Sequence, residues 1–139
     1  MILGIGTDLV DSRRIQTAMD RHPCKFVTRV FTNAEIDAAE KTSNAANYLA
    51  KRFAAKEAVY KALSGSGVTG CGWRDAEILS AMSGAPIVKL TGRCKTALET
   101  MTPDGYKASL AVSLSDEPPY AMAFIVISAV PAEWIKSNE

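Results

Sequence analysis

The sequence predicts an α+β fold, a small single domain in which helices pack against an antiparallel-rich sheet. Several short stretches alternate apolar and polar residues as strands do, and an alanine-rich stretch at residues 43–64 follows a helical period. No internal repeat or low-complexity linker interrupts the 139 residues, of which 47% are hydrophobic and 22% charged. This length and balance suit one core, so we expect a single domain over residues 1–139.

In the N-terminal part we expect a strand followed by two short helices. Residues 2–10 are apolar and β-branched, as in a buried strand. Asp11 is a suitable N-cap for a helix that runs to about Met19, because its carboxylate can accept hydrogen bonds from free amides of the first turn. Pro23 then favours the start of a second, short helical stretch.

A long helix is predicted in the middle of the chain. Thr32 and Glu35 have the spacing of a capping box, in which two residues satisfy each other's backbone amides. The long helix is then expected to begin near Ser43 and to end where Ser64 and Gly65 interrupt the pattern.

The C-terminal half alternates as strands do, apart from one further helix at about residues 93–101. A Gly-Ala-Pro turn at residues 84–86 joins the first two strands, and Asp-Glu-Pro-Pro at residues 116–119 joins the last two in an antiparallel hairpin. The four predicted strands cover residues 75–80, 87–90, 108–115 and 120–128.

Composition and charge exclude several classes of function. A net charge of +1 gives no general attraction for nucleic acid. Trp73 and Trp134 also lie outside any basic, aromatic-interleaved pattern of the kind that binds single strands. His22 is the only histidine, so neither a histidine triad nor a multi-histidine metal site can be built.

We expect a cytoplasmic protein with no membrane segment. The N-terminus lacks the basic lead and long apolar run of a signal peptide, and no apolar stretch approaches the roughly 20 residues that span a bilayer. Cys24, Cys71 and Cys94 are odd in number and form no CxxC pair. This usage argues against a disulfide framework and favours reduced thiols.

The first strand carries the first candidate site residue. Its even positions include Gly4, Gly6 and Asp8, whereas its odd positions are bulkier, so one face is expected to be packed and the other stripped. Two glycines beside an aspartate allow either another element or a ligand to approach the backbone next to a carboxylate. The GxG spacing is not a dinucleotide fingerprint, because Leu9 occupies the third glycine position.

The second candidate lies on the long helix, in the stretch RFAAKEAVYKAL. Phe53, Glu57 and Lys61 share one stripe of a helix with 3.6 residues per turn. Glu57 and Lys61 have the spacing and order of a surface salt bridge. Alternatively, Glu57 shares a Mg²⁺ ion with Asp8, because this hard cation prefers carboxylate and phosphate oxygens.

Basic and glycine residues near this helix extend the candidate site. Arg52, Lys56 and Lys61 would balance phosphate charge. The loop that follows contains Gly65 and Gly67 and lacks the Gly-Lys-Ser/Thr ending of a P-loop. Its free amides are nevertheless suited to a phosphate or adenosine group.

The segment after the first strand is locally basic, with Arg14, Arg21 and Lys25 among its charges. It is either a solvated face or a docking surface for an acidic protein. In the second case, positive charge would mainly raise the rate of encounter.

The stretches GIGTDLV and RFAAKEAVYKAL, about fifty residues apart, resemble the two signature motifs of phosphopantetheinyl transferases, specifically the small bacterial holo-[acyl-carrier-protein] synthases. RVFTNAEI, SGAPIVKLTG and the final hairpin are also similar, so the resemblance covers essentially the whole chain. It implies a phosphopantetheinyl transferase-like fold and transfer of the phosphopantetheine arm of coenzyme A to a serine of apo acyl carrier protein. Adenosine bisphosphate would be released, and the holo carrier would serve fatty acid biosynthesis.

The resemblance also implies residue roles and an assembly. Asp8 and Glu57 match residues that hold Mg²⁺ against the coenzyme A diphosphate, and Lys61 matches a lysine near the phosphates, so these three form the implied catalytic set. Glu57 or a water is favoured as the base that takes the serine proton. A homotrimer with coenzyme A at each subunit interface is implied as well. The remaining candidates are Arg52, Lys56, Gly65, Gly67 and Pro86 for the cofactor, and Arg14, Arg21 and Lys25 for docking of the carrier protein.

One position departs from the pattern. Many family members have a histidine after the Ser-x-Ser of the penultimate strand, whereas this chain has Asp116. If that histidine helps to hold phosphate, an anionic Asp116 does not replace it. Two other functions stay open at this point: a noncatalytic module that binds acyl carrier protein, and another Mg²⁺-dependent nucleotide enzyme that uses the same carboxylates.

Overall fold

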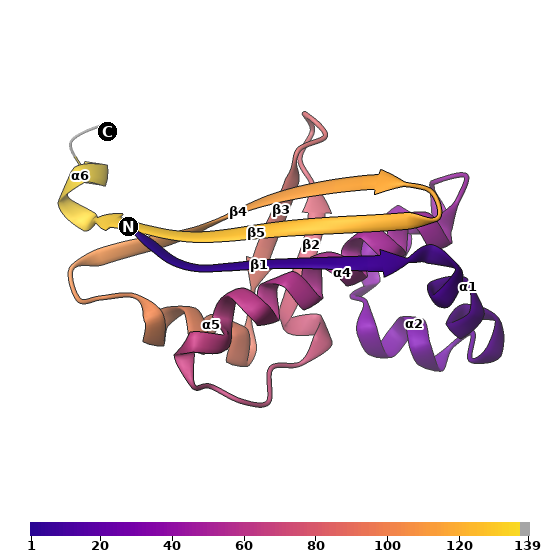
Figure 1. Ribbon diagram of the computed structural model, residues 1–139, viewed down its shortest axis with the longest axis horizontal. Helices are drawn as coiled ribbons and strands as arrows, with labels where there is room; N and C mark the ends of the chain where they lie inside the picture. The colour runs from indigo at the N-terminus through magenta and orange to yellow at the C-terminus, as the bar shows by residue number, and fades with distance from the viewer. Residues whose placement is uncertain (137–139) are drawn as a thin grey trace.

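The computed structural model describes residues 1–136 and has the α+β architecture that the sequence predicts. A three-stranded antiparallel sheet is accompanied by a two-stranded hairpin and by helices (Figure 1). In chain order the elements are β1 (Ile2–Asp11), α1 (Ser12–Arg21), α2 (Lys25–Val30), α3 (Asn33–Glu40), α4 (Ala45–Leu63), η1 (Ser64–Ser66), η2 (Trp73–Asp75), β2 (Ala76–Ser80), β3 (Pro86–Leu90), α5 (Gly92–Met101), β4 (Tyr106–Glu117), β5 (Tyr120–Pro131) and α6 (Ala132–Lys136).

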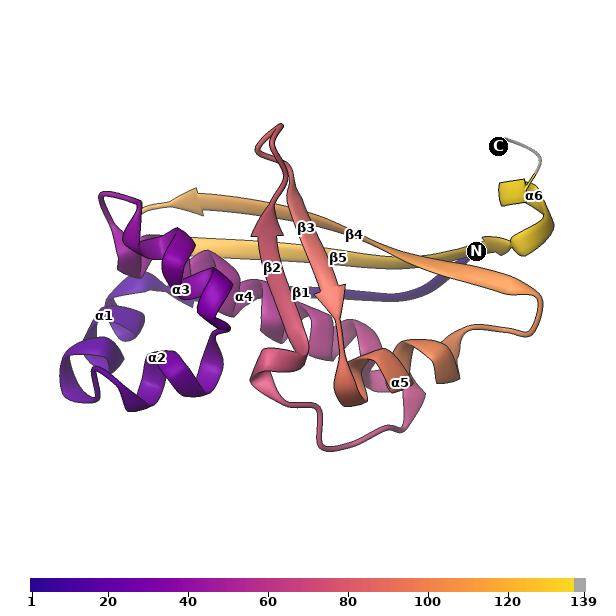
Figure 2. The same ribbon diagram turned by 180° about the vertical axis from the view of Figure 1, so that it is seen from behind.

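The N-terminal strand joins the C-terminal hairpin to form the main sheet, in the order β1, β5, β4. Asp8 of β1 and Leu114 of β4 both lie opposite Ala123 of the central strand. The β2–β3 hairpin forms a sheet of its own and projects past the β4 edge, as Figures 1 and 2 show. Both ends of the sequence therefore meet in one sheet.

One face of the main sheet packs against α4, and this contact forms the core. Figure 2 shows α4, α5 and the β2–β3 hairpin on this face. The helix places alanines on its inner side and β5 contributes every second residue, so helix and sheet approach closely. The buried residues at this contact include Ala54, Ala58, Ala62, Ala121, Ala123, Ile125 and Ile127.

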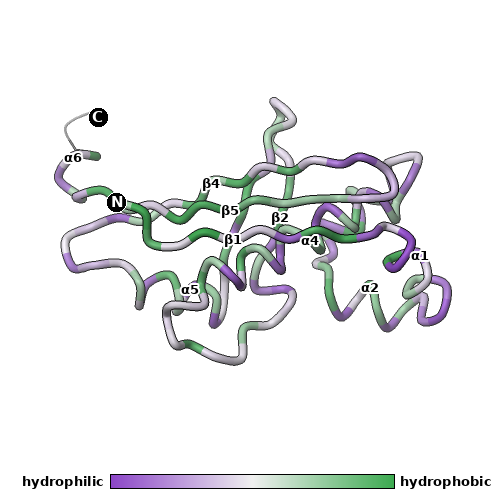
Figure 3. Tube along the Cα trace, viewed as in Figure 1, coloured by the Kyte–Doolittle hydropathy of each residue, from purple (hydrophilic) through white to green (hydrophobic). Residues whose placement is uncertain are grey.

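The opposite face of the sheet is uncovered and apolar. Ile5 is 60% exposed, Leu9 63% and Phe124 42%. The packing of β1 is thus the reverse of the expectation, because the glycine face meets α4 and the bulky face is open. In Figure 3 hydrophilic residues gather on α1, whereas β1 and β5 are mostly hydrophobic. Within the described residues, no helix combines the length and the apolar character needed to cross a bilayer.

The final hairpin is longer than predicted. β4 and β5 extend until only Pro118 and Pro119 separate them. Asp116 therefore belongs to β4, opposite Ala121, and not to the connecting turn.

Candidate functional site

Two glycines of β1 determine how closely α4 approaches the sheet. A Cβ atom on Gly4 would lie 2.2 Å from the carbonyl oxygen of Ala62, and one on Gly6 would lie 1.9 Å from that of Ala58. Both separations are far below van der Waals contact. The glycines therefore admit the helix and not a ligand, which decides between the two possibilities that the sequence left open.

Asp8 lies on the same face of β1 as these glycines and receives the side chain of Lys61 from α4. The ammonium of Lys61 donates to Oδ1 of Asp8 at 3.1 Å and to the carbonyl oxygen of Thr7 at 2.9 Å. Lys61 thus forms its ion pair with Asp8. The interpretation as a surface salt bridge required a pair with Glu57 instead. The partner of Lys61 is therefore on strand β1 and not on its own helix.

Glu57 is the second carboxylate of this cluster. Partial burial raises its pKa above the ordinary value, the negative charge of Asp8 raises the pKa further, and Lys61 partly offsets both. Two carboxylates therefore share a single lysine, and the site keeps a net negative charge that a further cation could balance. Oxygen donors with excess negative charge fit a hard divalent cation.

The described residues contain no group of three or more His, Cys, Asp or Glu side chains suited to a metal. A cation held by Asp8 and Glu57 alone would need other ligands. Magnesium is commonly bound in this way, by one or two carboxylates together with substrate phosphates and water. The donor set thus fits Mg²⁺, provided that a phosphate and water complete the coordination.

A small cavity of about 270 Å³ lies beside this cluster. Lys61, Gly6 and Thr7 line it together with Ile5 and Phe124, which belong to the open sheet face. Lys61 is therefore reached from the uncovered side of the sheet.

Arg52 lines a second cavity, of about 310 Å³, between α4, β4 and the β2–β3 hairpin. Its Nη2 donates to Oγ of Ser80 at 3.0 Å, and its guanidinium lies 3.7 Å from the centre of the Tyr48 ring. Burial lowers the pKa of Arg52, although it stays a cation. Pro86 lines the same cavity, so the structure brings together these two cofactor candidates.

Lys56 does not reach this cavity. Its side chain has no exposed surface, and its ammonium donates to Oε1 of Glu35 at 2.8 Å and to the carbonyl oxygens of Trp73 and Ala76 at 3.0 and 2.6 Å. Burial lowers the pKa of Lys56, and Glu35 opposes this shift. The prediction that Lys56 contacts the cofactor does not agree with this burial.

Glu35 completes a buried network that the sequence did not reveal as such. Its carboxylate also accepts from the backbone amides of Thr32 at 2.9 Å and Ile78 at 3.0 Å. One ion pair thus joins the start of α3, the middle of α4 and the start of β2. The capping box identified Glu35 only as a cap, and only the tertiary contact with Lys56 shows its second task.

Gly65 and Gly67 lie in or next to η1, at the C-terminal end of α4. Gly67 has a positive φ of 73°. At a rise of roughly 1.5 Å per residue, about 18 Å of helix separates this loop from Arg52, whereas Lys61 is only one turn away. The loop thus lies near the Asp8–Lys61 end of the candidate site.

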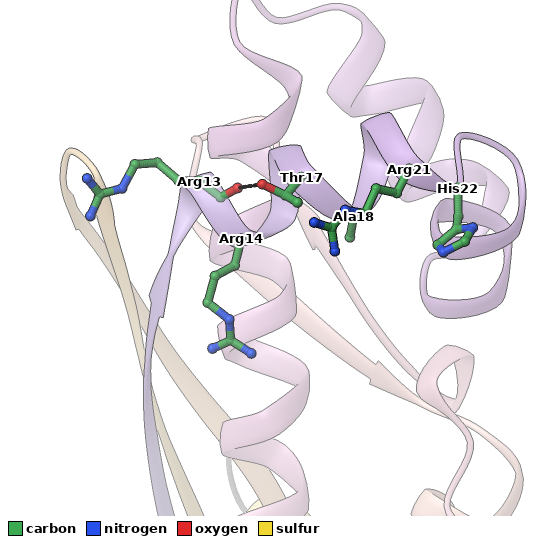
Figure 4. Close-up of a pocket in the computed structure, with 6 residues that line it drawn as sticks. All are labelled: Arg13, Arg14, Thr17, Ala18, Arg21 and His22. Atoms are coloured by element: carbon green, nitrogen blue, oxygen red, sulfur yellow. Dashed lines mark hydrogen bonds between the residues drawn. The ribbon is translucent and has the colours of Figure 1, made fainter.

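The docking candidates lie on α1 and α2. Arg14 and Arg21 line a shallow depression of about 460 Å³ on α1 (Figure 4), and Lys25 lines a neighbouring one of about 330 Å³. Figure 4 shows Arg13 pointing away from Arg14, and Arg13 pairs with Asp11 at 2.7 Å. Within residues 1–136, the positive charge of this surface that has no ion-pair partner is therefore carried by Arg14, Arg21 and Lys25.

Comparisons with known proteins show the family and agree with the fold. Residues 4–123 match the family model of the 4′-phosphopantetheinyl transferase superfamily. A holo-[acyl-carrier-protein] synthase of Methylorubrum populi is 47% identical over 131 residues, which cover 94% of this chain and 96% of the relative. A crystal structure of the Neisseria meningitidis synthase is similar with a TM-score of 0.78 and 35% identity, over 92% of this chain and 99% of that one.

A further solved structure contains a ligand. The Helicobacter pylori synthase in complex with coenzyme A is similar with a TM-score of 0.72 and 27% identity, over 89% of this chain and 99% of that one.

Proposed function

The chain belongs to the 4′-phosphopantetheinyl transferase superfamily, and on this premise we propose how its residues act. It transfers the phosphopantetheine moiety of coenzyme A to a serine of apo acyl carrier protein and so produces the holo form. The observation that carries this conclusion is the near full-length match to synthases. In this enzyme, the Asp8, Glu57 and Lys61 cluster would be the place of reaction.

In the transfer, the serine oxygen forms a bond to the phosphorus that carries the pantetheine arm. The bond from that phosphorus to the bridging oxygen of the diphosphate breaks, and adenosine bisphosphate leaves. Catalysis of such a step depends on positioning and on stabilisation of the charge on the phosphate oxygens. Lys61 supplies a fixed ammonium for this charge, because Asp8 and the backbone of Thr7 hold it in place.

Asp8 and Glu57 would hold Mg²⁺, since they are oxygen donors that share one lysine. When bound, the ion neutralises phosphate charge and acts as a Lewis acid. Glu57 or a water remains our candidate for the base that takes the serine proton.

Arg52 and Pro86 would bind a phosphate-bearing part of the coenzyme. The cavity that they line contains a buried cation, as an anionic group requires. Gly65 and Gly67 remain candidates at the other end of α4. Arg14, Arg21 and Lys25 would dock the carrier protein, because their basic surface lies on α1 and α2, directly after the strand that carries Asp8.

A homotrimer with coenzyme A shared between subunits is proposed as well. The open face of the sheet is apolar over Ile5, Leu9 and Phe124, as an interface between copies would be. At about 100° per residue, Arg52 and Glu57 point roughly 140° apart around α4. We therefore propose that a coenzyme at the carboxylates of one copy uses the Arg52 cavity of a neighbour.

A cytoplasmic location is part of the same proposal. Cys24, Cys71 and Cys94 are free thiols, as expected in a reducing compartment.

The transfer is tested by incubating the protein with coenzyme A, Mg²⁺ and apo acyl carrier protein, followed by mass spectrometry of the carrier. We expect the mass to rise by one phosphopantetheine unit, and we expect no rise when EDTA replaces Mg²⁺. A carrier that keeps its apo mass under both conditions would exclude the transfer.

A further inference from the structure

The mouth of the Arg52 cavity carries a second cation, Lys51, to which no motif assigns a role. Its side chain is 24% exposed, and its ammonium lies 3.7 Å from Oδ1 of Asp116 on β4. This separation is longer than a hydrogen bond and describes a charge contact only. The ammonium is therefore held near the cavity without a tight, directional bond to Asp116.

Arg52, the more buried cation of this cavity, has a hydrogen-bond donor without an acceptor among the described residues. Arg52 is 4% exposed, and its Nε is one of two buried side-chain polar atoms in residues 1–136 without a hydrogen-bond partner. A buried donor without an acceptor is unfavourable and calls for an explanation. A ligand oxygen in the cavity would supply the acceptor.

The second unpartnered atom lies in the same corner. It is Oδ1 of Asn47, whose Nδ2 donates to Oδ2 of Asp116 at 2.9 Å. Asp116 thus receives an amide and an ammonium from successive turns of α4. This contact with Asn47 lowers the pKa of Asp116, so the residue is an anion at neutral pH.

The charged side chains at the cavity determine the charge of the ligand that it can bind. Arg52 and Lys51 are two cations beside one anion, and only Lys51 is in contact with that anion. A group with two negative charges and several acceptor oxygens would use both cations. A phosphate monoester has this character.

We propose that Lys51 is a second binding residue for the phosphate group that enters the Arg52 cavity, and that Asp116 is an anion competing for it. The inference rests on the proposed function, which supplies the coenzyme phosphate. Binding exchanges the contact of Lys51 with Asp116 for one with phosphate. Asp116 therefore weakens the hold on the coenzyme and on the adenosine bisphosphate that leaves.

The test measures the binding of adenosine 3′,5′-bisphosphate by calorimetry in EDTA at low salt. The proteins are the wild type, Lys51→Met, Asp116→Asn and the double variant. Lys89→Met is the matched control, because Lys89 is an exposed lysine on the hairpin that forms the cavity wall. Thermal unfolding verifies that each variant is folded.

We expect Lys51→Met to weaken binding about tenfold, as loss of one charge-assisted contact does. Asp116→Asn should strengthen binding roughly threefold, because Lys51 no longer has a competing anionic partner. In the Lys51→Met background this gain should disappear, because Asp116 acts through Lys51. Lys89→Met should bind like the wild type.

Three results would overturn the proposal. One is wild-type affinity in Lys51→Met, and another is weaker binding in Asp116→Asn. The third is an undiminished gain from Asp116→Asn in the double variant, which would mean that Asp116 repels the phosphate directly. If the wild type transfers the arm but one of these results is found, only this inference fails, whereas absence of transfer by the wild type would reject the proposed function.

Discussion

The ammonium of Lys61 lies 3.1 Å from the carboxylate of Asp8, a residue 53 positions away in the chain. The lysine of the helix thereby neutralises the strand carboxylate, while Glu57 of its own helix keeps a raised pKa. One ammonium therefore balances two carboxylates. The negative charge that remains is what a bound metal ion would balance at a site that takes a phosphate.

Glu57→Gln and Asp8→Asn should each abolish transfer, because each removes a negative charge that a divalent cation needs. In both variants Mg²⁺ should no longer strengthen the binding of coenzyme A, which calorimetry with Mg²⁺ and with EDTA would show. Equal affinities for the wild type and both variants in all conditions would argue against the metal site.

Glu57→Gln should also change how stability depends on pH. The folded pKa of Glu57 is raised above its ordinary 4.5, so the charged form is disfavoured on folding. The wild-type free energy of unfolding should therefore decrease as pH rises from 4.5 through the folded pKa, and the variant should lack this decrease. Urea unfolding in EDTA at pH 5 and pH 8 compares the two. A variant less stable than the wild type at pH 8 would show that Glu57 stabilises the fold.

Gly6→Ala should destabilise the protein by about 3 kcal/mol, because the new methyl group would overlap the carbonyl oxygen of Ala58. Gly65→Ala is the matched control, since its Cβ would meet only Cε of Met101 at 3.9 Å. Urea unfolding of both variants measures the difference. Equal stability of the two would mean that α4 moves away from β1 at little cost.

Arg14→Glu combined with Arg21→Glu should raise the KM for carrier protein about tenfold at low salt, through slower encounter. Coenzyme A binding should be unchanged, and the effect should shrink at high salt because of screening. Lys107→Glu, at the far end of the sheet, serves as the control. An unaltered KM for the carrier would remove α1 from the docking surface.

Leu9→Glu should convert the expected trimer into a monomer and leave the fold intact, because this side chain is 63% exposed in the isolated chain. Light scattering gives the mass, and circular dichroism reports the fold. Met82→Glu, at the exposed tip of the β2–β3 hairpin, should retain the trimer. A wild type that is a stable and fully active monomer would rule out the shared site.

Local signals predicted much of the fold. Asp11 caps α1, and Thr32 and Glu35 form the expected capping box. The long helix was expected near Ser43 to Ser64 and occupies Ala45–Leu63. These features depend only on residues close in the sequence, so sequence patterns are sufficient to predict them.

Features that depend on distant residues were missed or reversed. A helical wheel places Lys56 beside Glu57 and cannot show that Glu35, 21 positions earlier, meets it in the core. For the same reason the helical spacing could not show that Lys61 pairs with Asp8 of β1. The faces of β1 were reversed because the bulky residues are open in this chain and the glycines meet α4. In each case the deciding contact is tertiary.

Helix α4 carries Arg52 and Lys56 on one side and Glu57 and Lys61 on another, within three turns. Insertion of one residue between Arg52 and Glu57 would turn one part of the helix by about 100° and advance it by roughly 1.5 Å relative to the other. The cavity, the buried ion pair and the carboxylate cluster would then no longer face their partners together. Changes of chain length should therefore be tolerated in the connection between Gly67 and Gly72 and rejected within the helix, so that the spacing of these four residues is as strongly constrained as their identity.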